Sequence, residues 1–195
     1  MLIGVLLAAG RGSRMGRTKQ LMPWPPPDGQ STIIAASFDA VDAHVQHMIV
    51  VLGHDADAVR HALGERVFTV AHCDADAPMY ESIRAGVAAA RDLHPSADVL
   101  VHPADHPAVR AGTIRTLIDA AGRYTGRAIL PQHGDKGGHP VLVPANLTPR
   151  LIDHHGEGGL RQYWHDFPDL CHRLPVDDPG CVRDIDTPSD YDTGC

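Results

Sequence analysis

The sequence lacks any apolar run long enough to cross a membrane. Its longest runs, such as Leu2–Ala9, are far shorter than the roughly 20 residues that a spanning helix needs. The N-terminus also has no basic region before its apolar run, which leads directly into a Gly-rich segment, so it is unlike a secretory signal. We expect a soluble, cytoplasmic protein with no membrane partner.

Lysine is nearly absent. Lys19 and Lys136 are the two lysines among 195 residues, and arginine supplies the other basic side chains. The formal net charge is −7 and no basic face is visible, whereas a general nucleic-acid binder usually has one. Because of this charge we expect no nucleic-acid partner. A genome that favours arginine is as good an explanation of the scarcity of lysine as a functional role for the two lysines.

The cysteines show no pairing pattern. None of them forms a C-x-x-C motif, which disfavours a disulfide framework or a zinc ribbon. We expect free thiols at Cys73, Cys171, Cys181 and Cys195. The length is sufficient for one α/β domain that buries its core without such staples, so we expect a single domain over residues 1–195.

Short β-rich runs alternate with helical patterns along the chain. Strands are predicted at Leu2–Leu7, Met48–Leu52, Arg66–Ala71, Val99–His102, Ala128–Pro131, Pro140–Val143, Cys171–Val176 and Cys181–Ile185. Helices are predicted at Thr32–Val45 with Ser31 as its N-cap, Ala56–Leu63, Tyr80–Leu93, Thr113–Ala121, Leu147–His154 and Gly158–Trp164. The Pro-rich segment at Pro23–Gly29 predicts a stiff surface loop. This alternation predicts a three-layer α/β/α, Rossmann-like fold with a mostly parallel sheet.

A Gly-rich loop, Ala8–Lys19, follows the first strand. In sheets of this class ligands bind beyond the carboxyl ends of the strands. The three glycines of the loop let backbone N–H groups approach a polyphosphate, and Arg14 and Lys19 add charge for phosphate oxygens. The loop therefore predicts a phosphate site, with an ordinary structural turn as the alternative.

Two common phosphate-binding motifs do not fit this loop. A G-x-G-x-x-G dinucleotide fingerprint would need glycine where Met15 stands. A Walker A loop that starts at Gly10 or Gly12 would need glycine at Met15 or Arg17. A dehydrogenase is therefore the weakest interpretation.

The loop resembles a longer signature. The order Leu7-Ala8-Ala9-Gly10-x-Gly12-x-Arg14-Met15-Gly16-x-x-Lys19 is similar to that of nucleotidyltransferases, in particular the MocA/MobA-like family, which makes molybdenum cofactor dinucleotides. In that family the loop wraps a nucleoside triphosphate. The resemblance implies nucleotide-binding roles for Ala8, Ala9, Gly10, Gly12, Arg14 and Lys19, and catalytic roles for Arg14 and Lys19.

A second segment, Met79–Gly86, resembles the G-M-x-x-S-L-R-A-G segment of the same family. The resemblance implies that Ser82 lies near the nucleotide base. Pro78, Tyr80 and Glu81 differ from the family pattern, which leaves the choice of base open. An ordinary helix start is the alternative.

A third segment, Val101–Pro107, resembles the A-D-x-P motif of the family, and Asp105 matches its magnesium ligand. A carboxylate at the end of a strand is well placed to hold Mg²⁺, a hard cation that prefers oxygen. His102 and His106, four residues apart, suggest zinc instead, but Pro103 and Pro107 break the helix that would bring such a pair together.

Two later segments extend the resemblance. Asp135–Val141 is similar to the family's R-G-H-P-V segment, with Gly137 in place of arginine, and implies that His139 contacts the acceptor. A turn histidine that caps backbone groups is the equal alternative. Val182–Asp190 resembles the terminal D-I-D-T-P-E-D, and Asp186 matches the second metal ligand. Asp184 is the fallback because both carboxylates would lie on one side of a strand; acids on solvated turns are the alternative.

Other features carry no site. Asp177–Gly180 is interpreted as a turn, and His154, His155 and the remaining histidines as surface residues.

The resemblance implies a Mg²⁺-dependent transfer of a nucleotidyl group from an NTP to a phosphorylated acceptor, with release of pyrophosphate. CTP and molybdopterin are the favoured pair, and an enzyme that accepts the finished cofactor is a further partner. Two rivals stay open. One is the same chemistry on another acceptor, such as a sugar phosphate. The other is a nucleotide-binding module that does not turn over.

Overall fold

The structure of the protein is a computed structural model that describes residues 1–10, 18–25, 29–74, 76–155 and 159–192. Its strands are β1 (Leu2–Ala8), β2 (Pro23–Trp24), β3 (Ser31–Thr32), β4 (His47–Leu52), β5 (Thr69–His72), β6 (Asp98–Pro103), β7 (Ala128–His133), β8 (Lys136–Gly137), β9 (Val141–Val143) and β10 (Cys171–Pro175). Its α-helices are α1 (Ile33–Asp42), α2 (Ala56–Leu63), α3 (Met79–Leu93), α4 (Ala111–Ala121), α5 (Thr148–Asp153), α6 (Leu160–Asp166) and α7 (Pro188–Asp192). Short 3₁₀ helices lie at η2 (Lys19–Leu21), η3 (Pro168–Leu170) and η4 (Pro179–Val182).

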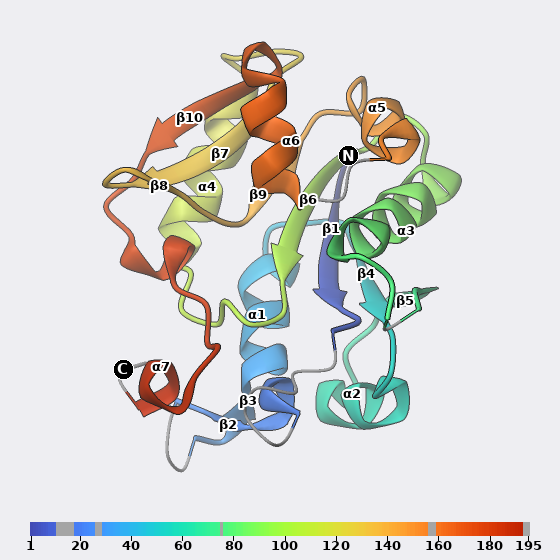
Figure 1. Cartoon of the computed structure of the whole chain (residues 1–195), viewed down its shortest axis with the longest axis vertical. Coiled ribbons are helices and arrows are strands. Elements are labelled where there is room, and N and C mark those ends of the chain that lie inside the picture. The colour runs from blue at the N-terminus through green and yellow to red at the C-terminus, as the bar shows by residue number, and fades with distance from the viewer. Residues whose placement is uncertain (11–17, 26–28, 75, 156–158, 193–195) are drawn as a thin grey trace.

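Eight of these strands form one mixed sheet in the order β10-β7-β9-β6-β1-β4-β5, with β8 paired to β7 (Figure 1). The strands β6, β1, β4 and β5 run parallel, and β9 runs antiparallel between β6 and β7. The parallel strands therefore end at one edge of the sheet, and β9 begins beside the end of β6. The predicted three-layer α/β fold with a mostly parallel sheet is confirmed.

Helices cover both faces because strand side chains alternate between them. On β1, Ile3 and Val5 belong to a core that includes Tyr80, Ile83 and Val87 of α3. Leu6 and Ala8 belong to the opposite core, with residues of α1, α2 and α4. In Figure 1, α3 and α6 pass in front of the sheet.

Helix α3 lies very close to the sheet. A Cβ atom at Gly86 would stand 2.4 Å from Val5 Cγ1 and 2.8 Å from Val51 Cγ2. Glycine at this position therefore allows the helix to approach β1 and β4.

Two predicted boundaries in the first half were wrong. Thr32, not Ser31, caps α1, since its hydroxyl accepts a hydrogen bond from Ala35 N and Ser31 pairs with Trp24 across β2 and β3. The third sheet strand begins at Thr69 instead of Arg66. The Arg66 guanidinium donates to Asp39 and to Leu63 O, which keeps this residue beside the end of α2.

The strand predicted at Cys181–Ile185 is also wrong. The 3₁₀ helix η4 (Pro179–Val182) occupies its start, and the rest has no partner strand among the described residues. The backbone instead bonds to loops: His139 N donates to Cys181 O at 2.7 Å and Ile185 N donates to Asp105 O at 3.0 Å. These hydrogen bonds therefore attach the segment Cys181–Ile185 to the turn before β9 and to the residues that follow β6.

Other local predictions have mixed outcomes. Cys73, Cys171 and Cys181 are free thiols, as expected, while Cys195 lies outside the described residues. His154 is half-buried and packs against the rings of Tyr80, Tyr163 and Phe167, so its placement on the surface was wrong. Among the described residues, no helix combines the length and apolar character needed to cross a bilayer.

Candidate functional site

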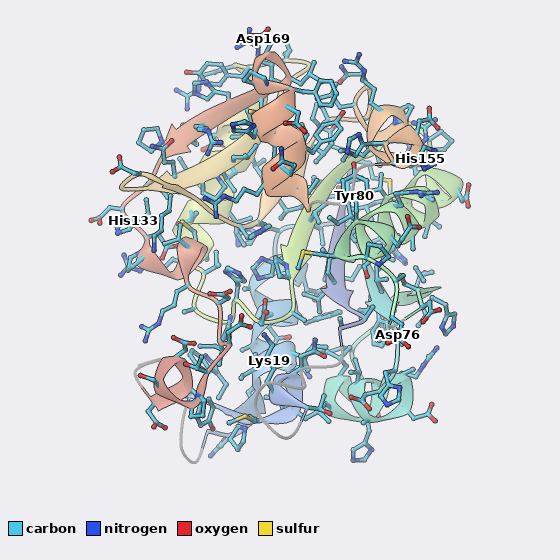
Figure 2. All side chains as sticks on the ribbon, viewed as in Figure 1. Lys19, Asp76, Tyr80, His133, His155 and Asp169 are labelled. Atoms are coloured by element: carbon cyan, nitrogen blue, oxygen red, sulfur yellow. The ribbon has the colours of Figure 1, made fainter. Side chains whose placement is uncertain are left out.

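Three charged residues from distant parts of the chain meet at the carboxyl-end edge of the sheet. Lys19 Nζ lies 2.8 Å from Asp105 Oδ2 and also donates to Asp186 Oδ1. Figure 2 labels Lys19 below the arrowheads of β1 and β6 as drawn in that view. The lysine is 9% exposed, and the side chains of Asp105 and Asp186 are 22% and 32% exposed. The structure thus brings together Lys19, Asp105 and Asp186 in one half-buried cluster.

Lys19 is held by the residues that flank the short helix η2. Thr18 Oγ1 donates to Asp55 Oδ2 at 2.8 Å, which ties the segment to the start of α2. Met22 N donates to Lys19 O, and Ile33 N donates to Met22 O at the start of α1. Both contacts fix the backbone from which the lysine side chain extends.

The two aspartates are held by a common backbone contact. Asp105 follows β6, and Ala104 N donates to Leu7 O at the end of β1. Ile185 is completely buried, and its N–H donates to Asp105 O. Because Asp186 follows Ile185 directly, burial of the isoleucine places the second carboxylate opposite the first.

The charge of Lys19 is maintained by these carboxylates. Burial lowers the pKa of Lys19, but the charges of Asp105 and Asp186 and their hydrogen bonds outweigh it, and the pKa lies above the ordinary 10.5. The ammonium is therefore positive at any physiological pH. It neutralises one of the two facing negative charges.

Three histidines pack behind Asp105. The ring centroids of His102 and His106 lie 6.1 Å apart, and those of His106 and His139 lie 5.2 Å apart, all edge to face. His106 Nε2 lies 3.9 Å from Asp105 Oδ1, and His102 Nε2 contacts His106 O at 3.2 Å. The Nδ1 atoms of the three histidines are buried without a hydrogen-bond partner.

These imidazoles are neutral. Burial, reinforced by the His106 ring, lowers the pKa of His139 to about 3 against the opposing influence of Asp105. Burial likewise lowers the pKa of His102 and, despite Asp105 and Asp184, that of His106. The ring of His139 is therefore a neutral hydrogen-bonding group without positive charge at neutral pH. The backbone contact of the turn is made by the main-chain N–H of His139, which donates to Cys181 O, and not by its ring.

Three further predicted site residues lie at or just beyond the end of β1. Ala8 and Ala9 are buried at the end of β1, and Gly10 is exposed beyond them. Gly12 and Arg14 lie outside the described residues, so their predicted phosphate contacts stay predictions.

Ser82 faces another part of the molecule. Its hydroxyl donates to Cys73 Sγ at 3.5 Å, at the end of β5. Beside this contact a hollow of about 350 Å³ opens between the end of β5 and the outer side of α3, with Glu81, Arg84 and Ile152 in its wall. The contact that Ser82 makes with Cys73 is therefore separate from the cluster of Lys19, Asp105 and Asp186.

Asp178 is a structural residue that the turn interpretation missed. It is 1% exposed, and its Oδ2 accepts from Arg110 N at 2.9 Å and from Thr113 Oγ1 at 2.6 Å. Its Oδ1 accepts from Gly180 N at 3.0 Å. An acidic residue before Pro179 is a signal for a capped turn. The other contact of Asp178, with the start of α4, joins residues that are distant in sequence, so the local sequence does not indicate it.

The lysine–aspartate cluster fits a divalent cation. The Lys19 ammonium is a cation that already stands between two carboxylates, the donor type that Mg²⁺ prefers. Among the described residues no three His, Cys, Asp or Glu side chains form a fuller metal site. Mg²⁺ is commonly held by one or two carboxylates together with water and substrate phosphates, so two aspartates suffice. Asp184, the fallback ligand, is exposed.

A mostly parallel sheet with charged residues at its carboxyl-end edge is typical of α/β proteins that bind ligands, nucleotides among them, at that edge. The family model of the MobA-like NTP transferase domain matches residues 4–170. The chain therefore belongs to the MobA-like NTP transferase family, as a nucleotidyltransferase.

Individual relatives cover nearly the whole chain. The nicotine blue oxidoreductase of Paenarthrobacter nicotinovorans is 30% identical over 94% of this chain and 91% of its own. The molybdenum cofactor cytidylyltransferase of Escherichia coli (strain K12) is 28% identical over 97% of this chain and 93% of its own. The crystal structure of Rv0371c from Mycobacterium tuberculosis H37Rv is 31% identical with a TM-score of 0.83, over 98% of this chain and 95% of that one. The same mycobacterial protein has also been crystallised as a complex with manganese, with a TM-score of 0.77 at 30% identity over 98% and 96% of the two chains.

Proposed function

We propose that this protein, as one domain over residues 1–195, transfers a cytidylyl group from CTP to the phosphate of a molybdopterin-type acceptor and releases pyrophosphate. The observation that carries the proposal is the contact of Lys19 with both Asp105 and Asp186, directly after the Gly-rich loop of β1. A cation and two carboxylates at this edge are suited to a triphosphate with its metal.

Each part of the cluster has a separate task in this proposal. Asp105 and Asp186 hold Mg²⁺, which supplies neutralisation of phosphate charge when it is bound. Lys19, Arg14 and the amides of the Gly-rich loop orient the triphosphate and stabilise the leaving pyrophosphate. The acceptor phosphate is already an anionic nucleophile, so no protein group has to remove a proton. Catalysis then depends on positioning and charge.

The substrates are assigned to two regions. Ser82 and the adjoining hollow at the end of β5 take the nucleotide base. The volume of the hollow lies at the lower end of the range for small-molecule sites, roughly 300–1,000 Å³. His139 contacts the acceptor through a neutral ring, which donates or accepts a hydrogen bond. Similarity to a cytidylyltransferase over almost the whole chain supports CTP and molybdopterin.

The test is pyrophosphate release with each of the four NTPs, Mg²⁺ and molybdopterin, for the natural chain and for Asp105→Asn. We expect the highest kcat/KM with CTP, and loss of turnover in Asp105→Asn with the melting temperature within a few degrees of the natural chain. The amide keeps the volume of the side chain and removes the charge. The control is Asp39→Asn, which changes the exposed ion pair between Asp39 and Arg66 and should leave turnover unchanged.

Three results would contradict parts of the proposal. A higher kcat/KM with GTP reverses the choice of base. Turnover with a sugar phosphate in place of molybdopterin changes the acceptor. Oxidation of NADH or NADPH without any requirement for an NTP would contradict the transfer reaction itself.

A further inference from the structure

The contacts of Lys19 differ from those of a simple phosphate-binding lysine. Its ammonium is directed at two carboxylates, and it lies in the place that a cation between Asp105 and Asp186 would take. The two carboxylates come from segments 81 positions apart (186 minus 105), and without a cation their charges would repel each other across a half-buried space.

We infer that Lys19 is an internal counter-ion that exchanges with the metal. In the metal-free protein the ammonium joins Asp105 to Asp186 and keeps the site assembled. When the metal binds, like charge expels the ammonium, which then needs other acceptor oxygens. The inference rests on the proposed metal role of the two aspartates and adds an order to substrate binding.

The exchange has an energetic consequence. A metal that arrives alone must displace a buried ammonium that would lose its partners, so bare metal should bind weakly. A metal that arrives with a triphosphate brings phosphate oxygens to which the ammonium can turn. Metal and nucleotide then bind cooperatively, and this coupling is reciprocal.

The surroundings favour movement of the lysine side chain over movement of the aspartates. Asp105 O is fixed by Ile185 N, and Asp105 Oδ1 faces the His106 ring. Lys19 has a long flexible stem, and the hydrogen bonds that hold its segment are made by Thr18 and by the backbone, not by the ammonium. The ammonium can leave while its backbone stays in place.

The experiment measures binding of Mn²⁺ alone, without nucleotide, from the decrease of the free-ion signal in electron paramagnetic resonance. The proteins are the natural chain, Lys19→Met and Lys136→Met. Lys136→Met is the matched control, because it removes the other lysine of the chain, which is exposed in β8. We expect Lys19→Met to bind Mn²⁺ at least tenfold more tightly than the natural chain, and Lys136→Met to bind it equally.

Thermal melting gives an independent readout. Without metal, Lys19→Met should melt below the natural chain because its two carboxylates face each other. Mn²⁺ should restore its melting temperature, while Mn²⁺ alone should change that of the natural chain little. Should Lys19→Met fail to fold without metal, Lys19→Gln keeps a neutral donor for the carboxylates and is measured in the same way.

The outcomes separate this inference from the proposed function. Equal or weaker binding of Mn²⁺ by both Lys19 variants overturns the counter-ion role, even if CTP turnover is normal. Tighter binding supports it, even if molybdopterin is not the acceptor. Absence of Mn²⁺ binding in every variant overturns both the inference and the metal role of the aspartates.

Discussion

The carboxylate of Asp178 shows how a single buried side chain joins separate parts of this molecule. It accepts hydrogen bonds from the first turn of α4 and from the η4 segment that leads to Asp186. A buried donor without a partner lowers the stability of the folded state. Asp178 therefore stabilises both the start of α4 and the η4 segment beside the candidate site.

Asp178→Ala should lower the free energy of unfolding by about 2–4 kcal/mol, because Arg110 N, Thr113 Oγ1 and Gly180 N lose their acceptor. The measurement is urea unfolding at neutral pH. Asp177→Ala is the matched control: its side chain is exposed and its contact with Arg110 is made by the backbone carbonyl. That variant should differ from the natural chain by less than about 0.5 kcal/mol. Equal losses in both variants would show that the buried cap has no special role.

Residue patterns predicted part of the site and missed the rest for a physical reason. Lys19, Asp105 and Asp186 follow strands or close recognisable segments, so the local sequence indicates them. The contacts between them span 86 and 167 residues, and nothing in the local sequence indicates that the ammonium contacts both carboxylates. The packing of His102, His106 and His139 against one another was not predicted for the same reason, since His139 lies more than thirty positions from His106 and meets it only through the fold.

At the level of elements, strand prediction failed where one face of an extended segment is buried without a partner strand. Cys181 and Ile185 are buried while Asp184 is exposed, an alternation that a half-buried strand also shows. A strand requires a neighbouring strand with unpaired backbone groups, and those groups are distant in sequence. The helices were predicted better, because their apolar periodicity and capping residues are local.

Helix α3 provides a test of close packing at this scale. In most helices Gly→Ala stabilises by up to about 1 kcal/mol. At Gly86 the added methyl would overlap Val5 and Val51, so Gly86→Ala should instead destabilise by about 1–3 kcal/mol. Gly112→Ala in α4 meets no atom within 4 Å and should be neutral or slightly stabilising. Thermal unfolding of the two variants measures the difference, and effects of the same sign would contradict the close approach of α3.

Across the whole molecule, the direction of β9 explains why neutral histidines accompany the charged cluster. The strands β6 and β9 are antiparallel, with Val101 opposite Val141, so the turn before β9 lies at the edge where β6 ends. His139 in that turn therefore contacts His106, which follows β6. The segment that leads to Asp186 bonds to both regions, through Cys181 O to His139 N and through Ile185 N to Asp105 O. Folding the chain thus buries imidazoles that must stay unprotonated.

This burial makes stability depend on pH. His139 has a pKa of about 3 in the folded protein and an ordinary value of 6.5 in the unfolded chain, so below 6.5 the unfolded state binds more protons. The contribution of His139 to the free energy of unfolding is therefore complete above 6.5 and is lost as the pH falls from 6.5 toward 3. Between about pH 7.5 and about pH 5 this one group should account for a loss of about 2 kcal/mol. We expect His139→Gln to show a shallower fall of stability over this interval than the natural chain, measured by urea unfolding at each pH. His165→Gln, which replaces an imidazole with 80% of its side chain exposed, should keep the natural slope. If His139→Gln also keeps the natural slope, the pKa of His139 is the same in the folded and unfolded states, and burial in the folded protein does not lower it.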